Sequence, residues 1–343
     1  MPEVDLLHHG DREVGAGLVD LAVNVQAPQP PPWLLDVLTA ALAQAGAYPD
    51  PSPAVAAVAS AHGCDPASVL LTNGAAEAFT LLARLPWRRP LVVHPQFTEP
   101  EAALRAAGHT VQRLVLSSDN GFRLDPAAVD PAADLVVVGN PTNPTSRLHP
   151  ADAVAGLLRP GRLVVVDEAF MDVTDQRQSL AALAPTTEGL LVVRSLTKTF
   201  GLAGLRAGHL LAAPALVAEL APHQPHWSVN ALAVAATVAC LGLEGEAHRR
   251  AVADRLPPRL AHLSRALRAA GLDVVEDPAG PFVLARHDRA DALRERLRHH
   301  GFALRRGDTF PGLGPQWLRV AARDEATTDA LSHALTTALQ ELP

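Results

Sequence analysis

The most informative stretch of this 343-residue chain is Arg194-Ser195-Leu196-Thr197-Lys198-Thr199-Phe200-Gly201-Leu202-Ala203-Gly204-Leu205-Arg206. Lys198 is the only lysine; the other 28 of the 29 basic residues are arginines. A guanidinium stays protonated near neutral pH, whereas a lysine amine can act as a nucleophile and form a Schiff base with a carbonyl compound. We therefore predict that Lys198 is a catalytic amine rather than a surface lysine.

The residues around Lys198 support this interpretation. Residues 190–193 form a short apolar run, partly β-branched, which is typical of a buried strand. Ser195 lies three residues before the amine, and Arg206 lies eight residues after it, beyond a glycine-containing loop. A hydroxyl and a guanidinium at these positions can both bind one phosphate group.

Composition excludes several classes of protein. The net charge of -7, without a block of basic residues, argues against a nucleic-acid partner. The longest apolar run, residues 231–243, is too short to span a membrane. The acidic residues 1–5 do not resemble a secretory signal. Cys64 and Cys240 lie far apart, which favours buried thiols in a reducing cytosol over a disulfide or a metal site. We expect a cytoplasmic protein.

The first two thirds of the chain predict an α/β fold. Apolar strand-like runs alternate with helical segments, which indicates a mostly parallel sheet covered by helices on both faces. Ligands bind such sheets beyond the carboxyl ends of the strands. Five polar or aromatic residues follow predicted strands, so we expect them to converge on one site: Asn73, Phe97, Asn143, Asp167 and Lys198.

A second anion-binding feature precedes the lysine in the sequence. Residues 69–72 read as a strand, and residues 73–77 then open a helix. Free N–H groups and the positive end of the helix dipole make such a junction suitable for an anion. By itself this signal is weak.

The pattern changes near residue 243. A long arginine-rich helix over residues 244–270 is followed by a smaller α+β set, with strands at 272–276, 282–285 and 317–321 and helices at 290–300 and 325–342. We predict a large domain of residues 28–243 and a small domain of residues 1–27 and 244–343.

Over nearly its whole length, the chain resembles the fold-type-I pyridoxal-phosphate enzymes of the aminotransferase class I/II superfamily. Within it, the branch of cobalamin-biosynthesis threonine-phosphate decarboxylases and histidinol-phosphate aminotransferases is most similar. The resemblance rests on motifs that are weak singly but specific in this order: His9-Gly10-Asp11, Tyr48-Pro49-Asp50, Asn143-Pro144-Thr145-Ser146, Asp167-Glu168-Ala169-Phe170-Met171-Asp172, residues 195–206, Phe310-Pro311-Gly312-Leu313-Gly314 and Leu318-Arg319-Val320.

The resemblance implies a pyridoxal 5'-phosphate cofactor held by named residues. Lys198 would hold it as a Schiff base and later move protons. Asp167 would face the pyridine nitrogen and keep it protonated, which makes the ring an electron sink. Asn143 would bond the 3-oxygen of the ring, and Phe97 would stack on its face.

The phosphate of the cofactor would be bound by several groups. These are Ser195, Arg206, which can form bidentate charge-assisted bonds, and the N–H groups of Ala75 and Ala76. Tyr48 would reach it from a partner subunit, so the resemblance implies a homodimer with shared sites. Phe170 stands where many family members have tyrosine, as expected in the cobalamin branch.

The resemblance also implies a substrate with an anion at each end. Arg319 matches the arginine that binds the α-carboxylate. If its strand continues, Arg323 lies on the same side about 13 Å away, at roughly 3.3 Å per residue. His9 and Asn24 resemble residues near the distal anion. We therefore expect a phosphorylated amino-acid substrate.

Three functions remain open at this stage. The first is a threonine-phosphate decarboxylase-like enzyme or an aminotransferase of cobalamin biosynthesis. The alternative is a histidinol-phosphate-type aminotransferase. A third, of another class, is a catalytically silent relative that serves as a binding or regulatory protein, although retention of Lys198 with Asp167 and Arg206 argues against it.

Overall fold

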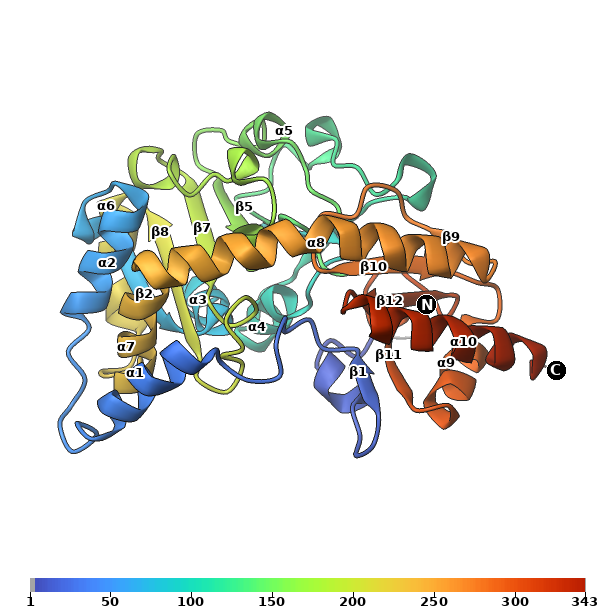
Figure 1. Ribbon diagram of the computed structural model, residues 1–343. Coiled ribbons are helices and arrows are strands. Elements are labelled where there is room, and N and C mark those ends of the chain that lie inside the picture. The colour runs from blue at the N-terminus through green and yellow to red at the C-terminus, as the bar shows by residue number, and fades with distance from the viewer. Residues whose placement is uncertain (1–3, 343) are drawn as a thin grey trace.

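The computed structural model describes residues 4–342, so residues 1–3 of the predicted N-terminal segment, and residue 343, lie outside it. Two sheets organise the described chain (Figure 1). The larger has the order β2-β8-β7-β6-β5-β3-β4 and is parallel except for β8, which runs against both neighbours. The predicted α/β fold is thus confirmed. Its strands are β2 (Val69–Asn73), β3 (Pro90–His94), β4 (Gln112–Val115), β5 (Leu135–Gly139), β6 (Leu163–Asp167), β7 (Leu190–Ser195) and β8 (Ala207–Ala212).

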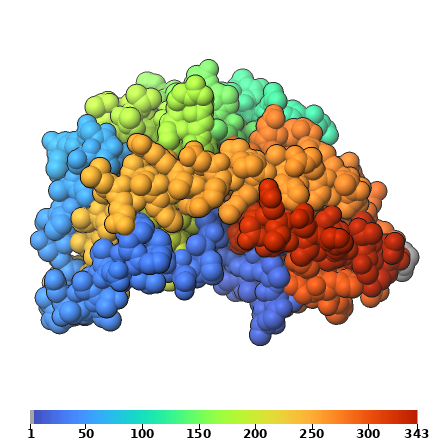
Figure 2. Space-filling view, viewed as in Figure 1, coloured from blue at the N-terminus to red at the C-terminus, as the bar shows by residue number. Residues whose placement is uncertain are grey.

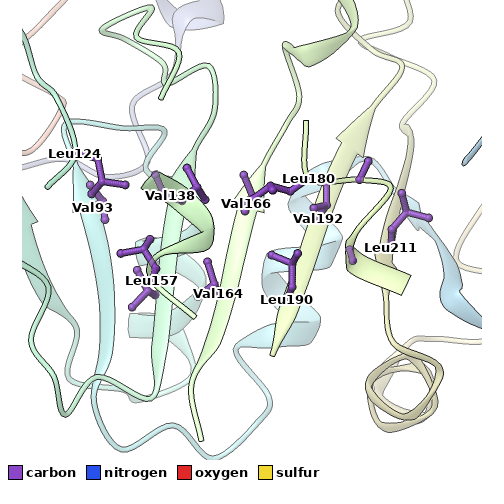
Figure 3. Packing of buried hydrophobic residues seen from close by; sticks show 14 of the residues in the cluster. Val93, Leu124, Val138, Leu157, Val164, Val166, Leu180, Leu190, Val192 and Leu211 are labelled. Atoms are coloured by element: carbon purple, nitrogen blue, oxygen red, sulfur yellow. The ribbon is translucent and has the colours of Figure 1, made fainter. Parts of the chain in front are cut away.

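Helices cover both faces of this sheet. Val136 and Val138 point to one face with Val164, whereas Leu135 and Val137 point to the other, as strand alternation requires. Figure 3 shows the first of these layers. The first face packs against α2 (Ser52–His62), α5 (Ala151–Ala155) and α7 (Ala231–Cys240), and the second against α3 (Ala75–Leu82), α4 (Glu99–Ala106) and α6 (Pro214–Leu220).

The smaller sheet has five strands and its own core. Its order is β1-β11-β12-β10-β9, and β1 pairs in parallel with β11, so the N-terminal segment joins the C-terminal part of the chain. Leucines of three helices pack on it. The strands are β1 (Val19–Leu21), β9 (Asp273–Val274), β10 (Phe282–Arg286), β11 (Phe302–Arg306) and β12 (Trp317–Ala321); the helices are α8 (Leu243–Ala269), α9 (Ala290–His299) and α10 (Glu325–Gln340).

Helix α8 connects the two parts of the molecule. It runs across one face of the molecule, from α7 to the small sheet. In the view of Figure 2, α1 (Pro32–Leu42) and the N-terminal segment lie below it. Among the described residues, no helix is long and apolar enough to cross a membrane.

The structure differs from the sequence prediction in three strands. β11 was not predicted, because its sequence, FALRR, has only three apolar residues before two arginines. Residues 18–25 also read as a strand-like run in the sequence, but β1 has only three residues; β9 has two residues instead of the predicted five. Both lie at the edges of the small sheet, where only one neighbour stabilises a strand.

Candidate active site

The structure brings the predicted strand-end residues to one edge of the large sheet. β2, β3, β5, β6 and β7 all run in the same direction. Their carboxyl ends therefore meet at one edge. Asn73 and Asp167 are the last residues of β2 and β6, and the other three follow their strands within four residues: Phe97, Asn143 and Lys198.

Lys198 and Asp167 influence each other within a buried region. Burial, together with the positive charges of Arg319 and Arg206, lowers the pKa of Lys198 to about 8. Burial raises the pKa of Asp167 to about 6, although Lys198 and the N–H of Ala169, 3.1 Å from Oδ1, act in the opposite direction. A lysine with this pKa is more often a free amine near neutral pH than an ordinary one, as a nucleophile requires.

Three strands form a close-packed cradle beside Lys198. Gly208 of β8 pairs with Ser195 on one side and Thr72 on the other. A Cβ atom at Gly208 would lie 2.9 Å from the carbonyl carbon of Gly74 and 3.0 Å from the nitrogen of Ala75. Only glycine lets the backbone of β8 pass this close to the start of α3.

Arg206 lies over the first turn of α3. A Cβ atom at Gly74 would collide with its guanidinium, at 2.3 Å from Nη2. Arg206 itself has a φ of 62° and donates from Nη1 to the carbonyl oxygen of Ala203 at 3.0 Å. The N–H groups of Ala75 and Ala76 begin the helix, and no side chain caps it. A guanidinium beside a helix N-terminus is a binding site for an anion.

Asn143 connects the large sheet to the small one. Its Oδ1 accepts a hydrogen bond from Nη1 of Arg319, whose Nη2 donates to the carbonyl oxygen of Ala22. The Arg319 guanidinium also lies over the ring of Phe282, 5.3 Å from its centre. Arg319 and Asn143 are therefore adjacent.

The N-terminal segment lies against the same edge. The N–H of Gln26 donates to the carbonyl oxygen of Lys198 at 2.9 Å. Asn24 is buried, and its Oδ1 has no hydrogen-bond partner among residues 4–342. The ring of His9 lies 5.5 Å from that of Phe97, and its Nε2 bonds Oε1 of Glu99 at 2.6 Å.

The assumption made for Arg323 was wrong. β12 ends at Ala321, so Arg323 does not extend the strand of Arg319. Its guanidinium donates instead to the carbonyl oxygens of Asp20, at 3.2 Å, and Val23, at 2.6 Å. These bonds fasten the N-terminal segment to the small sheet because they satisfy one backbone acceptor within β1 and one just after it. A role in substrate binding remains a prediction.

Sequence analysis missed Arg305. It lies directly opposite Arg319 across β11 and β12, and both are almost fully buried, at 2% and 4% exposure. Nη2 of Arg305 donates to the carbonyl oxygen of His8 at 2.7 Å, and its Nη1 lies 3.7 Å from Oε1 of Glu13. Burial lowers the pKa of Arg305 to about 10. Only the apolar run before it, Phe302-Ala303-Leu304, hinted at a strand here.

Tyr48 lies away from the buried residues of the site. It is 76% exposed, in the loop between α1 and α2, and its ring stacks on Trp227 with centres 4.2 Å apart. Leu42, Trp227 and Leu243 are also exposed apolar residues near the ends of α1 and α7.

The comparisons with known proteins agree with this geometry. The model of the family described as aminotransferase class I and II matches residues 38–335. The chain belongs to this family. It is an enzyme of the pyridoxal-phosphate-dependent aminotransferase class.

Two curated relatives carry different names. A Mycobacterium tuberculosis protein named histidinol-phosphate aminotransferase is 47% identical over 93% of this chain and 87% of its own length. A threonine-phosphate decarboxylase of Sinorhizobium sp is 36% identical over 76% of this chain and 75% of its own length. Among solved structures, histidinol-phosphate aminotransferase from Sinorhizobium meliloti in complex with pyridoxal-5'-phosphate has a TM-score of 0.83 and 22% identity, covering 94% of this chain and 90% of that one.

The residues present in the aminotransferase fit this cofactor. Arg206 lies against Gly74 at the start of α3, and Ser195 pairs with Gly208 beside it, so these residues would hold the phosphate. Asp167, buried and without a direct ion pair among the described residues, suits a protonated pyridine nitrogen. Oδ1 of Asn143 is occupied by Arg319, so its amide nitrogen remains the group to donate to an oxygen on the ring. When bound, the cofactor supplies an electron sink for the reacting carbon.

Proposed function

We propose that this enzyme is a histidinol-phosphate-type aminotransferase. The observation that carries the proposal is the placement of Arg305 directly opposite Arg319. Opposed residues in antiparallel strands have Cα atoms about 4.5–5.5 Å apart. Side chains of opposed residues leave the same face of the sheet, so this pair suits a single dianionic phosphate better than two anions about 13 Å apart, as first expected. The 47% identity to a histidinol-phosphate aminotransferase supports the same choice.

Each site residue has a proposed role in this reaction. The amine of Lys198 anchors the cofactor and then moves a proton at the reacting carbon. Asp167 holds a proton on the pyridine nitrogen, and Asn143 orients the ring. Ser195, Arg206, Ala75 and Ala76 bind the phosphate of the cofactor, and Phe97 packs on its ring.

The substrate phosphate would be bound by Arg319 and Arg305. We keep Arg323, His9 and Asn24 as proposed substrate neighbours, because the N-terminal segment that Arg323 fastens lies beside Lys198. Arg323 would then act through the position of this segment.

A second candidate is threonine-phosphate decarboxylation, alone or within cobalamin biosynthesis. The 36% identical Sinorhizobium relative supports it. So does Phe170, which is buried against Phe282 with ring centres 5.1 Å apart, at the position where tyrosine is common in the family.

We further propose a cytoplasmic homodimer. The exposed, stacked aromatic pair of Tyr48 and Trp227 provides an apolar surface that a second copy would cover. Tyr48 would then complete the phosphate site of the partner. The two cysteines are free, as expected in a reducing compartment.

The deciding experiment compares two substrates on the purified holoenzyme. Histidinol phosphate has no carboxylate to lose, so its amino group should pass to a 2-oxo acid, with the Lys198→Ala variant as the inactive control. Threonine phosphate should release little carbon dioxide. Efficient release of carbon dioxide from threonine phosphate, without amino transfer from histidinol phosphate, would replace the first candidate by the second.

A further inference from the structure

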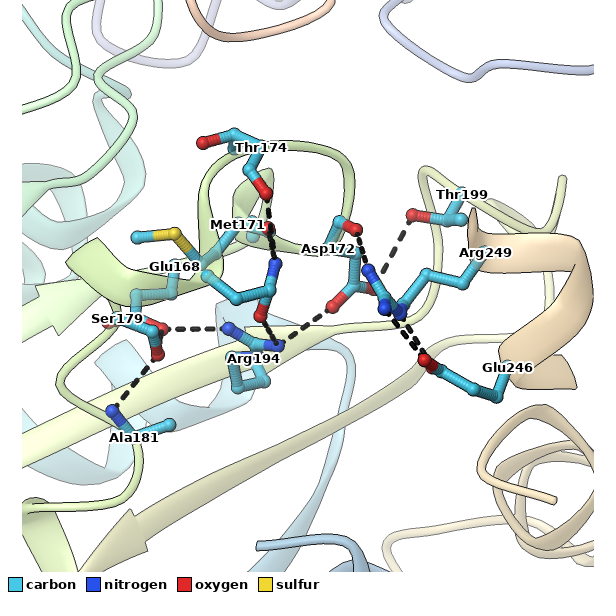
Figure 4. A network of polar contacts seen from close by, with 12 residues as sticks. Glu168, Met171, Asp172, Thr174, Ser179, Ala181, Arg194, Thr199, Glu246 and Arg249 are labelled. Atoms are coloured by element: carbon cyan, nitrogen blue, oxygen red, sulfur yellow. Dashed lines mark hydrogen bonds and ion pairs between the residues drawn. The ribbon is translucent and has the colours of Figure 1, made fainter. Parts of the chain in front are cut away.

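A buried network of charged side chains lies on the face of the large sheet opposite the cradle. At its centre, Arg194 donates from Nη1 to Oε2 of Glu168 at 2.8 Å and from Nη2 to Oδ1 of Asp172 at 2.9 Å (Figure 4). Glu168 also accepts bonds from the hydroxyl of Ser179, at 2.6 Å, and the N–H of Leu180, at 2.7 Å. The side chains of the three charged members are at most 9% exposed.

The network continues to the lysine loop, which is the connection of residues 196–206 that carries Lys198, and to α8. The hydroxyl of Thr199 lies 3.4 Å from Oδ2 of Asp172. Arg249 of α8 donates to the carbonyl oxygen of Asp172 at 2.8 Å and pairs with Glu246 at 2.7 Å. The loop that follows β6 is therefore held between β7, the lysine loop and α8.

Three members of the network are sequence neighbours of proposed cofactor-binding residues. Glu168 follows Asp167, Arg194 precedes Ser195, and Thr199 follows Lys198. Successive side chains of a strand point to opposite faces of a sheet. On β7, the network and the cofactor site therefore lie on opposite sides of the same backbone.

We propose that Arg194 is a positioning residue that aligns Asp167, Ser195 and Lys198 from behind the sheet through Glu168, Asp172 and Thr199. This inference rests on the proposed roles of those three residues. Arg194 contacts two carboxylates that are at most 9% exposed, so its removal leaves two buried negative charges without their shared cation. The repelling carboxylates would move the loops that carry Asp167 and Lys198, and functional groups tolerate displacements of only about 0.5 Å.

The chain offers a matched control at the opposite edge of the sheet. Arg162 immediately precedes β6 and is as buried as Arg194. It donates only to carbonyl oxygens, those of Ala133, Leu157 and Asp130. Arg162→Met should therefore lower the melting temperature without disturbing the cofactor.

The test measures the bound cofactor in holoenzymes carrying Arg194→Met, Arg194→Lys or Arg162→Met. In Arg194→Met we expect a weaker visible circular dichroism of the cofactor and a shifted pH midpoint of its absorption band. Cofactor release should be about tenfold faster, the scale seen when a residue behind a metal ligand is replaced. Arg194→Lys, which keeps the charge, should recover part of each change.

Two outcomes would overturn the inference. The first is an Arg194→Met enzyme whose cofactor dichroism, pH midpoint and cofactor release rate equal those of the unsubstituted enzyme. The second is an Arg162→Met enzyme in which these three quantities change as much as in Arg194→Met. If Arg194→Met does not fold, Arg194→Lys and Thr199→Val decide, and unchanged values in both reject the proposal. An unsubstituted enzyme without any cofactor band would instead refute the proposed function.

Discussion

Arg305 and Arg319 face each other across two antiparallel strands, although like charges in this position destabilise a sheet. Nη1 of Arg305 and Nε of Arg319 have no hydrogen-bond partner within residues 4–342. Burial, together with the charge of Arg305, holds the pKa of Arg319 well below its ordinary value. An anion between the two guanidiniums would satisfy these donors and remove the repulsion.

Arg305→Ala should reduce kcat/KM for histidinol phosphate by about 100-fold. Removing one member of a buried charge pair costs about 2–5 kcal/mol, and about 1.4 kcal/mol is tenfold. The effect on unphosphorylated histidinol should be small. Arg323→Ala, which breaks only bonds to backbone oxygens, should cost less than Arg305→Ala. A larger and phosphate-specific loss in Arg323→Ala would restore Arg323 as the phosphate ligand.

Asp167→Asn should stabilise the cofactor-free protein at neutral pH while abolishing turnover. Burial raises the pKa of Asp167 from 3.8 to about 6. The contribution of this carboxyl group to the free energy of unfolding is therefore fully present below about pH 4 and is lost as the pH rises through 6. A shift of this size corresponds to about 3 kcal/mol, at 1.36 kcal/mol per unit. Urea unfolding at pH 4 and pH 7.5 measures the difference. If Asp167→Asn changes the free energy of unfolding by the same amount at both pH values, the pKa of Asp167 is not raised.

Capture of the cofactor by Lys198 should accelerate with pH and level off early. Only the free amine reacts. With a pKa of about 8, the rate should rise about tenfold between pH 7 and pH 9 and then stay constant. With an ordinary lysine amine, whose pKa is near 10.4, the rate of reaction with the cofactor would still be rising at pH 10. Stopped-flow absorbance on cofactor-free enzyme gives these rates, and a continued rise to pH 10 would show that burial does not activate this amine.

Mixing two inactive variants should restore activity if the sites are shared between subunits. Lys198→Ala lacks the amine, and Tyr48→Ala lacks the proposed partner contact to the phosphate. In a mixed dimer, one site has both native residues, so up to about a quarter of full activity is expected after random exchange. Tyr48→Phe serves as the control for packing on Trp227. An active species that sediments as a monomer would argue against the dimer.

The sequence predicted those parts of the site that depend on local order along the chain. Lys198 and Asp167 follow continuous apolar strands, and parallel strands bring such residues to one edge of a sheet. Arg305 could not be found in this way, because its position depends on pairing between β11 and β12. A sequence pattern does not distinguish Arg305, which is buried, from its neighbour Arg306, which pairs with Asp308 at the surface.

The same limitation explains the error about Arg323. Extending the strand past Ala321 would have placed its side chain on the same side of the sheet as that of Arg319, about 13 Å along the strand. The main chain leaves the sheet there, and the next helix begins at Glu325 behind the cap of Asp324. The network around Arg194 was also missed, since it depends on a loop and on α8, which lie far apart in the sequence.

The central claim is that Lys198 carries the cofactor, and one measurement tests it most directly. Borohydride reduction of the holoenzyme, followed by peptide mapping, should place the label on a single peptide containing Lys198. Because no other lysine exists in the chain, only the N-terminal amine competes, and the Lys198→Ala variant controls for it. An active enzyme that yields no label on Lys198, or an active Lys198→Ala variant, would contradict the account.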